Sequence, residues 1–123
     1  MEIKHAQNKI KNFDESRGWE NSWNVKDLLL NINEETGELW NLIKWVDDEK
    51  QKQIIKNNSE EASDFIGDTL FLLLKLANQM NVNSQKALQN TLDEYEKRMP
   101  SETMKKVGHA NKLAGGIDAK EEK

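Results

Sequence analysis

The sequence predicts an all-α protein, a bundle of four or five helices that dimerises through its helices. Apolar residues recur at helical spacing over long stretches, and the residues that favour β-strands do not alternate with polar ones. Pro100 is the only proline, so little interrupts a helix. Charged residues make up 33% of the chain, which suits helices with solvated outer faces.

An irregular segment separates the first two expected helices. The periodic pattern of about residues 3–16 is broken by residues 17–19, which include a glycine, and no helical pattern resumes before Trp23. Asn24 is a favourable N-cap residue for the second helix, which we expect over about residues 25–46.

Each of the three following helices has its own start signal, and we expect the last to end before a proline. The signals are Asp47 or Asp48 for a short helix to about Lys56, Ser59 after the Asn57-Asn58 turn for a helix to about Met80, and Asn83 or Ser84 for a helix that ends before Pro100.

The chain length of 123 residues suggests one domain. We expect this domain to span residues 1–100, and we expect a tail, residues 101–123, that is mostly irregular because it contains a Gly-Gly break and ends in charged residues. A chain of this size buries only a modest core, so we expect a homodimer or a tetramer.

Composition excludes several classes of protein. The formal charge is −4, and Lys and Arg are interleaved with acids, which argues against binding a nucleic acid polymer. The absence of cysteine excludes disulfides and thiolate metal sites. The N-terminus is too charged for a secretory signal, and the longest apolar run, residues 70–74, is too short to span a membrane. We therefore expect a cytoplasmic protein that does not bind membranes.

Four acidic residues form two helical pairs. Glu35 and Glu38 lie three residues apart in the second expected helix, and Glu61 and Asp64 lie three apart in the fourth. Carboxylates at this spacing point the same way from a helix. Both pairs lie among apolar residues, where an unpaired negative charge is costly. If the two helices are neighbours, the four carboxylates share a small volume, which suits Mg²⁺, with Mn²⁺ as the alternative.

The direction of each acid follows from about 100° of rotation per residue. Glu35 falls in the middle of an apolar stripe formed by Leu28, Ile32, Leu39 and Val46. The fourth helix is apolar nearly all round, and its one polar arc contains Glu61, Asp64, Asp68, Lys75 and Gln79. Asp68, one turn beyond Asp64, would add a fifth carboxylate to the same site.

The pattern EExGEL at residues 34–39, followed by EExxD at residues 60–64, resembles the MazG-like all-α nucleoside triphosphate pyrophosphohydrolases. The segment 17–45 is similar to the dCTP pyrophosphatase branch, because it has Arg-x-Trp before the acidic helix and Trp45 one turn after the motif. The resemblance implies a Mg²⁺-dependent hydrolase that splits a nucleoside triphosphate into a monophosphate and pyrophosphate. It also implies a house-cleaning role toward a pyrimidine or modified deoxynucleotide.

The resemblance implies roles for individual residues. The metal ligands would be Glu35, Glu38, Glu61 and Asp64, and a carboxylate not fully used in coordination, Glu38 or Glu34, would take the proton of the attacking water. Trp19 and Trp45 match positions that flank the base, whereas we interpret Trp40 as a packing residue and leave Trp23 open. Asp68 falls where the branch has a tyrosine, and we count it among the substrate-binding residues.

Phosphate binding departs from the family pattern. Many relatives carry a Lys and an Asn after the second acidic motif, and residues 87–100 do not reproduce their spacing. Lys75, Arg98 and Lys112 are the candidates for phosphate contacts in their place.

Two alternatives remain. The chain could be a non-catalytic helical interaction module whose acidic stripe is solvated or binds a basic partner. It could also be a phosphoribosyl-ATP pyrophosphohydrolase, although the tryptophans near the predicted site and the closer match to the dCTP branch argue against this.

Overall fold

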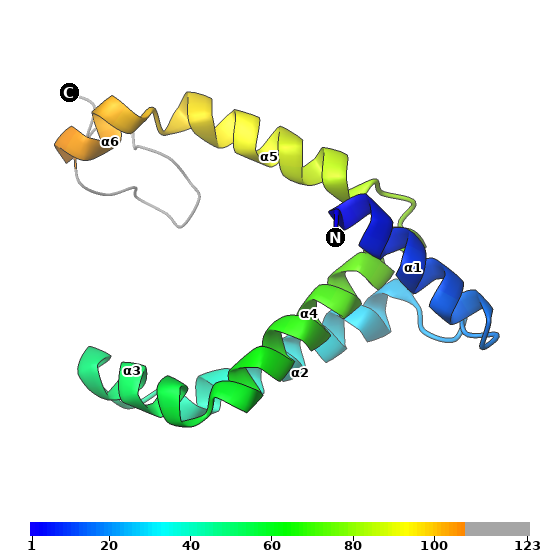
Figure 1. Cartoon of the computed structure of the whole chain (residues 1–123), viewed down its shortest axis with the longest axis horizontal. Helices are drawn as coiled ribbons and strands as arrows, with labels where there is room; N and C mark the ends of the chain where they lie inside the picture. The colour runs from blue at the N-terminus through cyan, green and yellow to red at the C-terminus, as the bar shows by residue number, and fades with distance from the viewer. Residues whose placement is uncertain (108–123) are drawn as a thin grey trace. The chain divides into compact units, whose positions relative to one another are not determined.

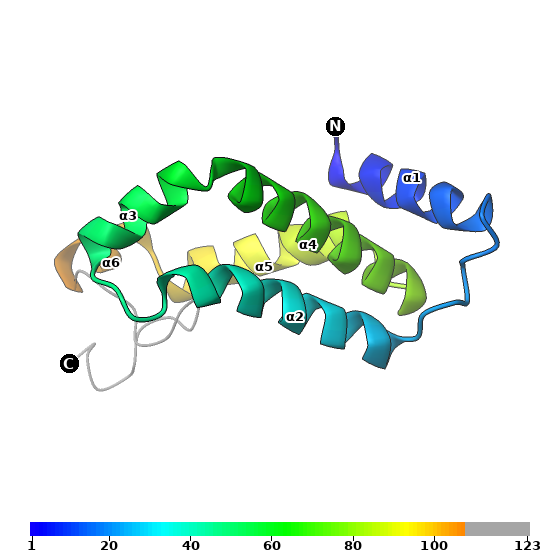
Figure 2. The ribbon, with the colours of Figure 1, turned by 90° about the horizontal axis from the view of Figure 1, so that it is seen from below.

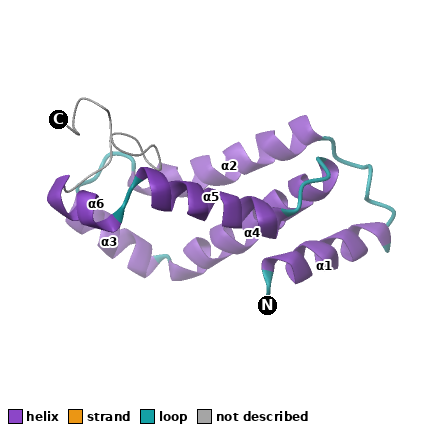
Figure 3. Cartoon of the chain, turned by 90° about the horizontal axis from the view of Figure 1, so that it is seen from above, coloured by secondary structure: helices purple, strands orange, loops and turns teal. Residues whose placement is uncertain are grey.

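The computed structural model describes residues 1–107, which contain six α-helices and no strand (Figure 3). The helices are α1 (Ile3–Glu15), α2 (Val25–Ile43), α3 (Asp48–Asn57), α4 (Ser59–Gln79), α5 (Ser84–Arg98) and α6 (Ser101–Val107). The prediction of an all-α protein is confirmed for this part of the chain. No helix within residues 1–107 is both long enough and apolar enough to cross a membrane.

The chain divides into two compact units, Met1–Ser84 and Gln85–Lys123. Helices α1 to α4 belong to the first unit, because each of them contacts α2 or α4. The division therefore falls at the start of α5 and not at Pro100, where we expected the domain to end.

The first unit is built on α2 and α4, which lie side by side and antiparallel (Figures 1 and 2). Helix α1 packs on α4, and the short α3 connects the end of α2 to the start of α4. The apolar stripe predicted for the second helix faces α4, because Leu28 is only 2% exposed. The core consists of Leu28, Leu72 and Leu76, with Val25, Ile32 and Phe71 packed against them.

Helix α2 ends at Ile43, three residues earlier than predicted. The N–H of Val46 donates to the carbonyl of Ile43 at 3.3 Å, which makes a single tight turn. Asp47 then adopts an extended backbone, with ψ of 171°, and its side chain accepts from the N–H of Lys50 as the N-cap of α3. A residue in this conformation cannot continue a helix, so Asp47 sets residue 46 as the last possible helical position, and the turn at residues 43–46 ends α2 before it.

The loop between α1 and α2 is irregular, as predicted. Gly18 has φ of +68°, a left-handed conformation that glycine adopts without steric cost. This turn brings the N–H of Trp19 to the carbonyl of Asp14 at 2.8 Å, so the chain folds back on the end of α1. The first residues of the loop are consequently held against the end of α1.

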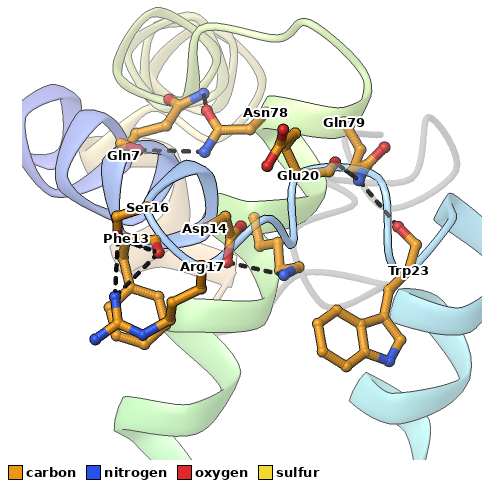
Figure 4. A network of polar contacts seen from close by, with 10 residues as sticks. Gln7, Phe13, Asp14, Ser16, Arg17, Glu20, Trp23, Asn78 and Gln79 are labelled. Carbon is orange, nitrogen blue, oxygen red and sulfur yellow. Dashed lines mark hydrogen bonds and ion pairs between the residues drawn. The ribbon is translucent and has the colours of Figure 1, made fainter.

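A polar network joins α1 to the end of α4 (Figure 4). The amide of Gln7 donates to Asn78 at 3.0 Å and to the carbonyl of Val82 at 2.7 Å. Its oxygen accepts from the N–H of Ser84 at 2.9 Å. Gln7 is buried, and these bonds satisfy its amide while fixing the segment that leads into α5.

In the second unit, a helix occupies part of the tail that we expected to be mostly irregular. Helix α6 begins directly after Pro100, whose carbonyl accepts from the N–H of Met104 at 2.9 Å. Glu102 lies in its first turn and Lys105 and Lys106 in its last, which complements the helix dipole. This charge order favours a short helix here. The remainder of the tail prediction lies outside the described residues.

Candidate functional site

A cavity of about 340 Å³ lies between α2 and α4, and carboxylates dominate its wall. Its lining residues are Glu35, Glu38, Leu39 and Leu42 from α2, and Glu61, Asp64, Phe65 and Asp68 from α4. The structure therefore brings together all four predicted metal ligands and adds Asp68, the fifth carboxylate that we expected beside them.

Helix geometry explains the meeting of the two acidic pairs. Carboxylates three residues apart lie on one side of their helix, and α2 and α4 turn these sides toward each other. Glu35 continues the stripe of Leu28 and Ile32, both of which pack in the core. The hydrophobic contact that pairs the helices thus also orients the acids.

The electrostatics of the cavity are unbalanced. The pKa of Glu35 is raised, first by its partial burial and then by the negative charges of Glu38, Asp68 and Glu34. Among the described residues, neither Lys nor Arg lines this cavity. Negatively charged side chains are consequently close together with no positively charged side chain of the described residues in the cavity wall. Their mutual repulsion makes ionisation of Glu35 less favourable.

The oxygen-rich lining has the chemistry that a hard divalent cation requires. Five carboxylates supply anionic oxygen ligands, and a bound cation would relieve the repulsion that raises the pKa of Glu35. Within residues 1–107, no three His, Cys, Asp or Glu side chains are grouped closely enough to hold a metal ion as they are oriented here. The carboxylates therefore share a cavity without converging on one point.

Glu34 and Glu38, the two candidates for the general base, occupy different surroundings. Glu38 lines the acidic cavity. Glu34 lines a separate depression with Trp23, Asp27 and other residues. Only Glu38 is therefore placed to act on a group bound in the cavity.

A second, smaller recess of about 140 Å³ lies beside the aromatic residues of the loop. Its lining residues are Trp19, Trp23, Asp27, Leu28, Asn31, Phe71, Leu72 and Lys75. The rings of Trp19 and Trp23 meet edge to face, with centroids 5.6 Å apart. Trp19 thus lies in an aromatic recess, as a base-binding residue would, but its neighbour is Trp23 and not the predicted Trp45.

Trp45 lies beyond the end of α2 and is 85% exposed. It is not among the residues that line the acidic cavity or the aromatic recess. Because α2 ends at Ile43, helix geometry does not set the direction of this side chain.

Neither Lys75 nor Arg98, the two described candidates for phosphate contacts, is among the residues that line the acidic cavity. Lys75 is buried, and its ammonium pairs with Asp14 at 2.9 Å. Arg98 belongs to the second unit, where its guanidinium pairs with Glu94 at 3.1 Å. Lys112 lies outside the described residues. Lys75 thus lines the aromatic recess and not the acidic cavity, and its part in binding substrate stays a prediction.

Sequence reasoning missed Asp14 as the partner of Lys75 and left Trp23 undecided. No spacing rule relates Asp14 to a residue 61 positions away. A signal for Trp23 did exist, since two tryptophans four residues apart at the end of an irregular segment can share one wall of a pocket.

Comparisons with known proteins add no assignment: no family model, no curated protein and no solved structure matches the chain.

Proposed function

We propose that the chain is a Mg²⁺-dependent nucleoside triphosphate pyrophosphohydrolase of the MazG-like type, with the dCTP pyrophosphatase branch as its nearest resemblance. The observation that carries the proposal is the acidic cavity, where five carboxylates from α2 and α4 surround one space without a basic residue among its lining. The motif resemblance names four of these five carboxylates from the sequence alone, without reference to the structure.

Glu35, Glu38, Glu61 and Asp64 are the residues that would hold the metal. When bound, Mg²⁺ would neutralise the phosphates and make the phosphorus more electrophilic. A triphosphate is strongly anionic, so an all-carboxylate site can accept it only through a cation. The raised pKa of Glu35 is consistent with this role, because burial is its first cause and the neighbouring negative charges of Glu38, Asp68 and Glu34 add to it.

The chemical step needs a water molecule and a base. The water oxygen bonds to one phosphorus of the α–β anhydride, and the bond from that phosphorus to the bridging oxygen breaks. Pyrophosphate and the monophosphate separate, and a carboxylate oxygen of Glu38 accepts the proton of the water. Glu38 is preferred to Glu34 because it lines the cavity. Positioning and charge stabilisation carry most of the rate in such reactions.

The aromatic recess would take the base of the nucleotide. Asn31, which lines the recess, precedes Glu35 by one helical turn, and Phe71 follows Asp68 by nearly one turn. Recess and cavity therefore follow one another along α2 and α4, so a nucleotide could place its base in one and its phosphates in the other. Stacking on an aromatic side chain contributes about 1–3 kcal/mol per base.

We also infer that the chain forms a homodimer or a tetramer. Large apolar side chains on α2 and α4 remain exposed over more than half of their surface: Leu30, Trp40, Ile66 and Leu70. Contiguous exposed apolar surface is typical of protein interfaces.

Pyrophosphate release tests the function directly. Purified protein with Mg²⁺ should release pyrophosphate from at least one member of a panel of canonical and modified deoxynucleoside triphosphates. Glu61→Gln should lower kcat by at least about 100-fold, as loss of a catalytic electrostatic contact does. Lys52→Met, which removes an exposed lysine on α3, should leave the rate unchanged. No release from any triphosphate would overturn the proposal.

A non-catalytic acidic module is the second candidate. It is favoured by the side-chain orientations, in which no three metal-binding groups of the described residues are close together. Calorimetric titration separates the two functions: Mg²⁺ binding that is lost in Glu61→Gln supports the hydrolase, and no heat with Mg²⁺ or Mn²⁺ supports the module.

A further inference from the structure

The ion pair between Lys75 and Asp14 is unusual because both side chains are almost entirely buried. The Lys75 ammonium donates to Asp14 Oδ1 at 2.9 Å, and the two side chains are 4% and 6% exposed. Removing two charges from water is expensive, and an apolar pair of similar volume is often at least as stable. A gain in stability alone therefore does not account well for the presence of this ion pair.

Both members of the pair are connected to the tryptophan loop. The carbonyl of Asp14 accepts from the N–H of Trp19 at 2.8 Å. The ammonium of Lys75 lies 4.5 Å from the centroid of the Trp23 ring, within the range of a cation–π interaction. The charged group of Lys75 thus contacts Trp23, whereas Asp14 contacts Trp19 through its backbone carbonyl.

Hydrogen bonds from α4 hold the same loop at further points. The amide of Gln79 donates to the carbonyls of Glu20 and Trp23, both at 2.9 Å (Figure 4). Phe13 of α1 meets Trp19 edge to face, with centroids 6.0 Å apart. The loop between α1 and α2 is consequently attached to both helices α1 and α4. Asp14 of α1 and Lys75 of α4 form the ion pair between these two helices.

We propose that Asp14 and Lys75 are positioning residues for the substrate. Their buried pair holds the Lys75 ammonium against the Trp23 ring, and Trp23 in turn meets Trp19 edge to face. The pair thus prepares the recess for a flat aromatic base before the base binds. The inference rests on the proposed function, because the base is that of the nucleotide whose phosphates reach the acidic cavity. Neither residue lines that cavity. Lys75 lines the aromatic recess beside Trp23, and Asp14, which does not line the recess, acts through Lys75.

A double variant separates positioning from simple support of the fold. Lys75→Met alone leaves the Asp14 carboxylate buried without its cation and is expected to destabilise the protein. Asp14→Leu with Lys75→Met removes both charges together and should recover most of that stability. If the pair positions the tryptophans, substrate binding should remain impaired although the fold is restored.

Fluorescence provides a readout that does not require hydrolysis. In a Trp40→Phe, Trp45→Phe background, all tryptophan emission comes from Trp19 and Trp23. The four deoxynucleoside monophosphates would be titrated without Mg²⁺. We expect at least one of them to change the emission, and we expect the Asp14→Leu, Lys75→Met double variant to weaken that binding by about tenfold or more. Glu61→Gln, which alters only the acidic cavity, should bind as the background protein does.

Steady-state kinetics give the second readout. The double variant should raise KM by about tenfold while kcat changes less than about twofold, as expected for lost binding rather than lost chemistry. Lys52→Met, which breaks the exposed pair with Asp48, is the matched control and should leave both constants unchanged.

The outcomes also separate this inference from the proposed function. If the double variant binds the monophosphates and turns over substrate like the background protein, the positioning role is wrong and the hydrolase stands. If no monophosphate changes the emission, the inference is likewise overturned. If binding depends on the ion pair but no triphosphate is hydrolysed, the positioning role stands and the hydrolase falls.

Discussion

At the scale of single residues, Glu35 is the most informative side chain. It occupies a position in an otherwise apolar stripe, and its pKa is raised by partial burial and by neighbouring carboxylates. A carboxyl whose pKa is higher in the folded than in the unfolded protein binds its proton more tightly when folded. Stability is therefore lost as the pH rises through that pKa.

Replacing Glu35 with Gln should stabilise the metal-free protein at neutral pH, and the gain should shrink as the pH falls and the wild-type carboxyl becomes protonated. Thermal melts in a chelating buffer between about pH 4 and pH 8 would measure this. Added Mg²⁺ should reverse the order, because only the wild type keeps this ligand. Glu96→Gln, on an exposed position of α5, is the control. A lower melting temperature for Glu35→Gln at pH 7 would contradict this reading of the cavity.

At the scale of elements, the start of α2 is set by a reciprocal cap. The Asn24 side chain accepts from the N–H of Asp27 at 2.9 Å, and the Asp27 side chain accepts from the N–H of Asn24 at 3.3 Å. This capping box fixes the residue at which the tryptophan loop becomes helix. It therefore also places Trp23, which directly precedes the cap.

Asn24→Ala should lower the free energy of unfolding by about 1 kcal/mol, the usual cost of losing an N-cap bond. Asn24→Ser keeps a cap oxygen and should cost only a few tenths of that amount, roughly 0.3 kcal/mol. Denaturant unfolding compares the two. Equal losses in both variants would show that the bond to Asp27 is not the source of the effect.

At the scale of the whole molecule, the described residues bury a small core. The buried apolar side chains of residues 1–107 are Leu28, Leu72, Leu76 and Ala77. By contrast, Ile66, Leu70 and Leu73 follow one face of α4 and stay about half exposed. Because this apolar face of α4 is exposed to water, we expect a second copy of the chain to bury it.

Light scattering after size exclusion should therefore give the mass of a dimer or tetramer. Leu70→Glu should shift the protein to a smaller species, because the new charge would be buried at the interface. Lys52→Glu changes charge on exposed α3 and should leave the mass unaltered. A monomeric wild type at micromolar concentration would refute the expected assembly.

The local structure was largely predictable from the sequence alone. The helical periods, the Asn24 cap and the break before Trp19 all depend on neighbouring residues, and the structure reproduces them. The two acidic pairs were predictable for the same reason, since spacing of three residues fixes their common side on a helix.

Tertiary structure decided what lies opposite each side chain. Lys75 shares the polar arc of α4 with Asp68, but seven residues correspond to about 10 Å along a helix. Its neighbours are therefore Asp14 and Trp23 from distant segments, and not the carboxylates of the cavity. Trp45 likewise lines neither the acidic cavity nor the aromatic recess, because α2 ends in a turn before it. The direction of a side chain is a local property that sequence determines, whereas its partner depends on which distant segment packs there.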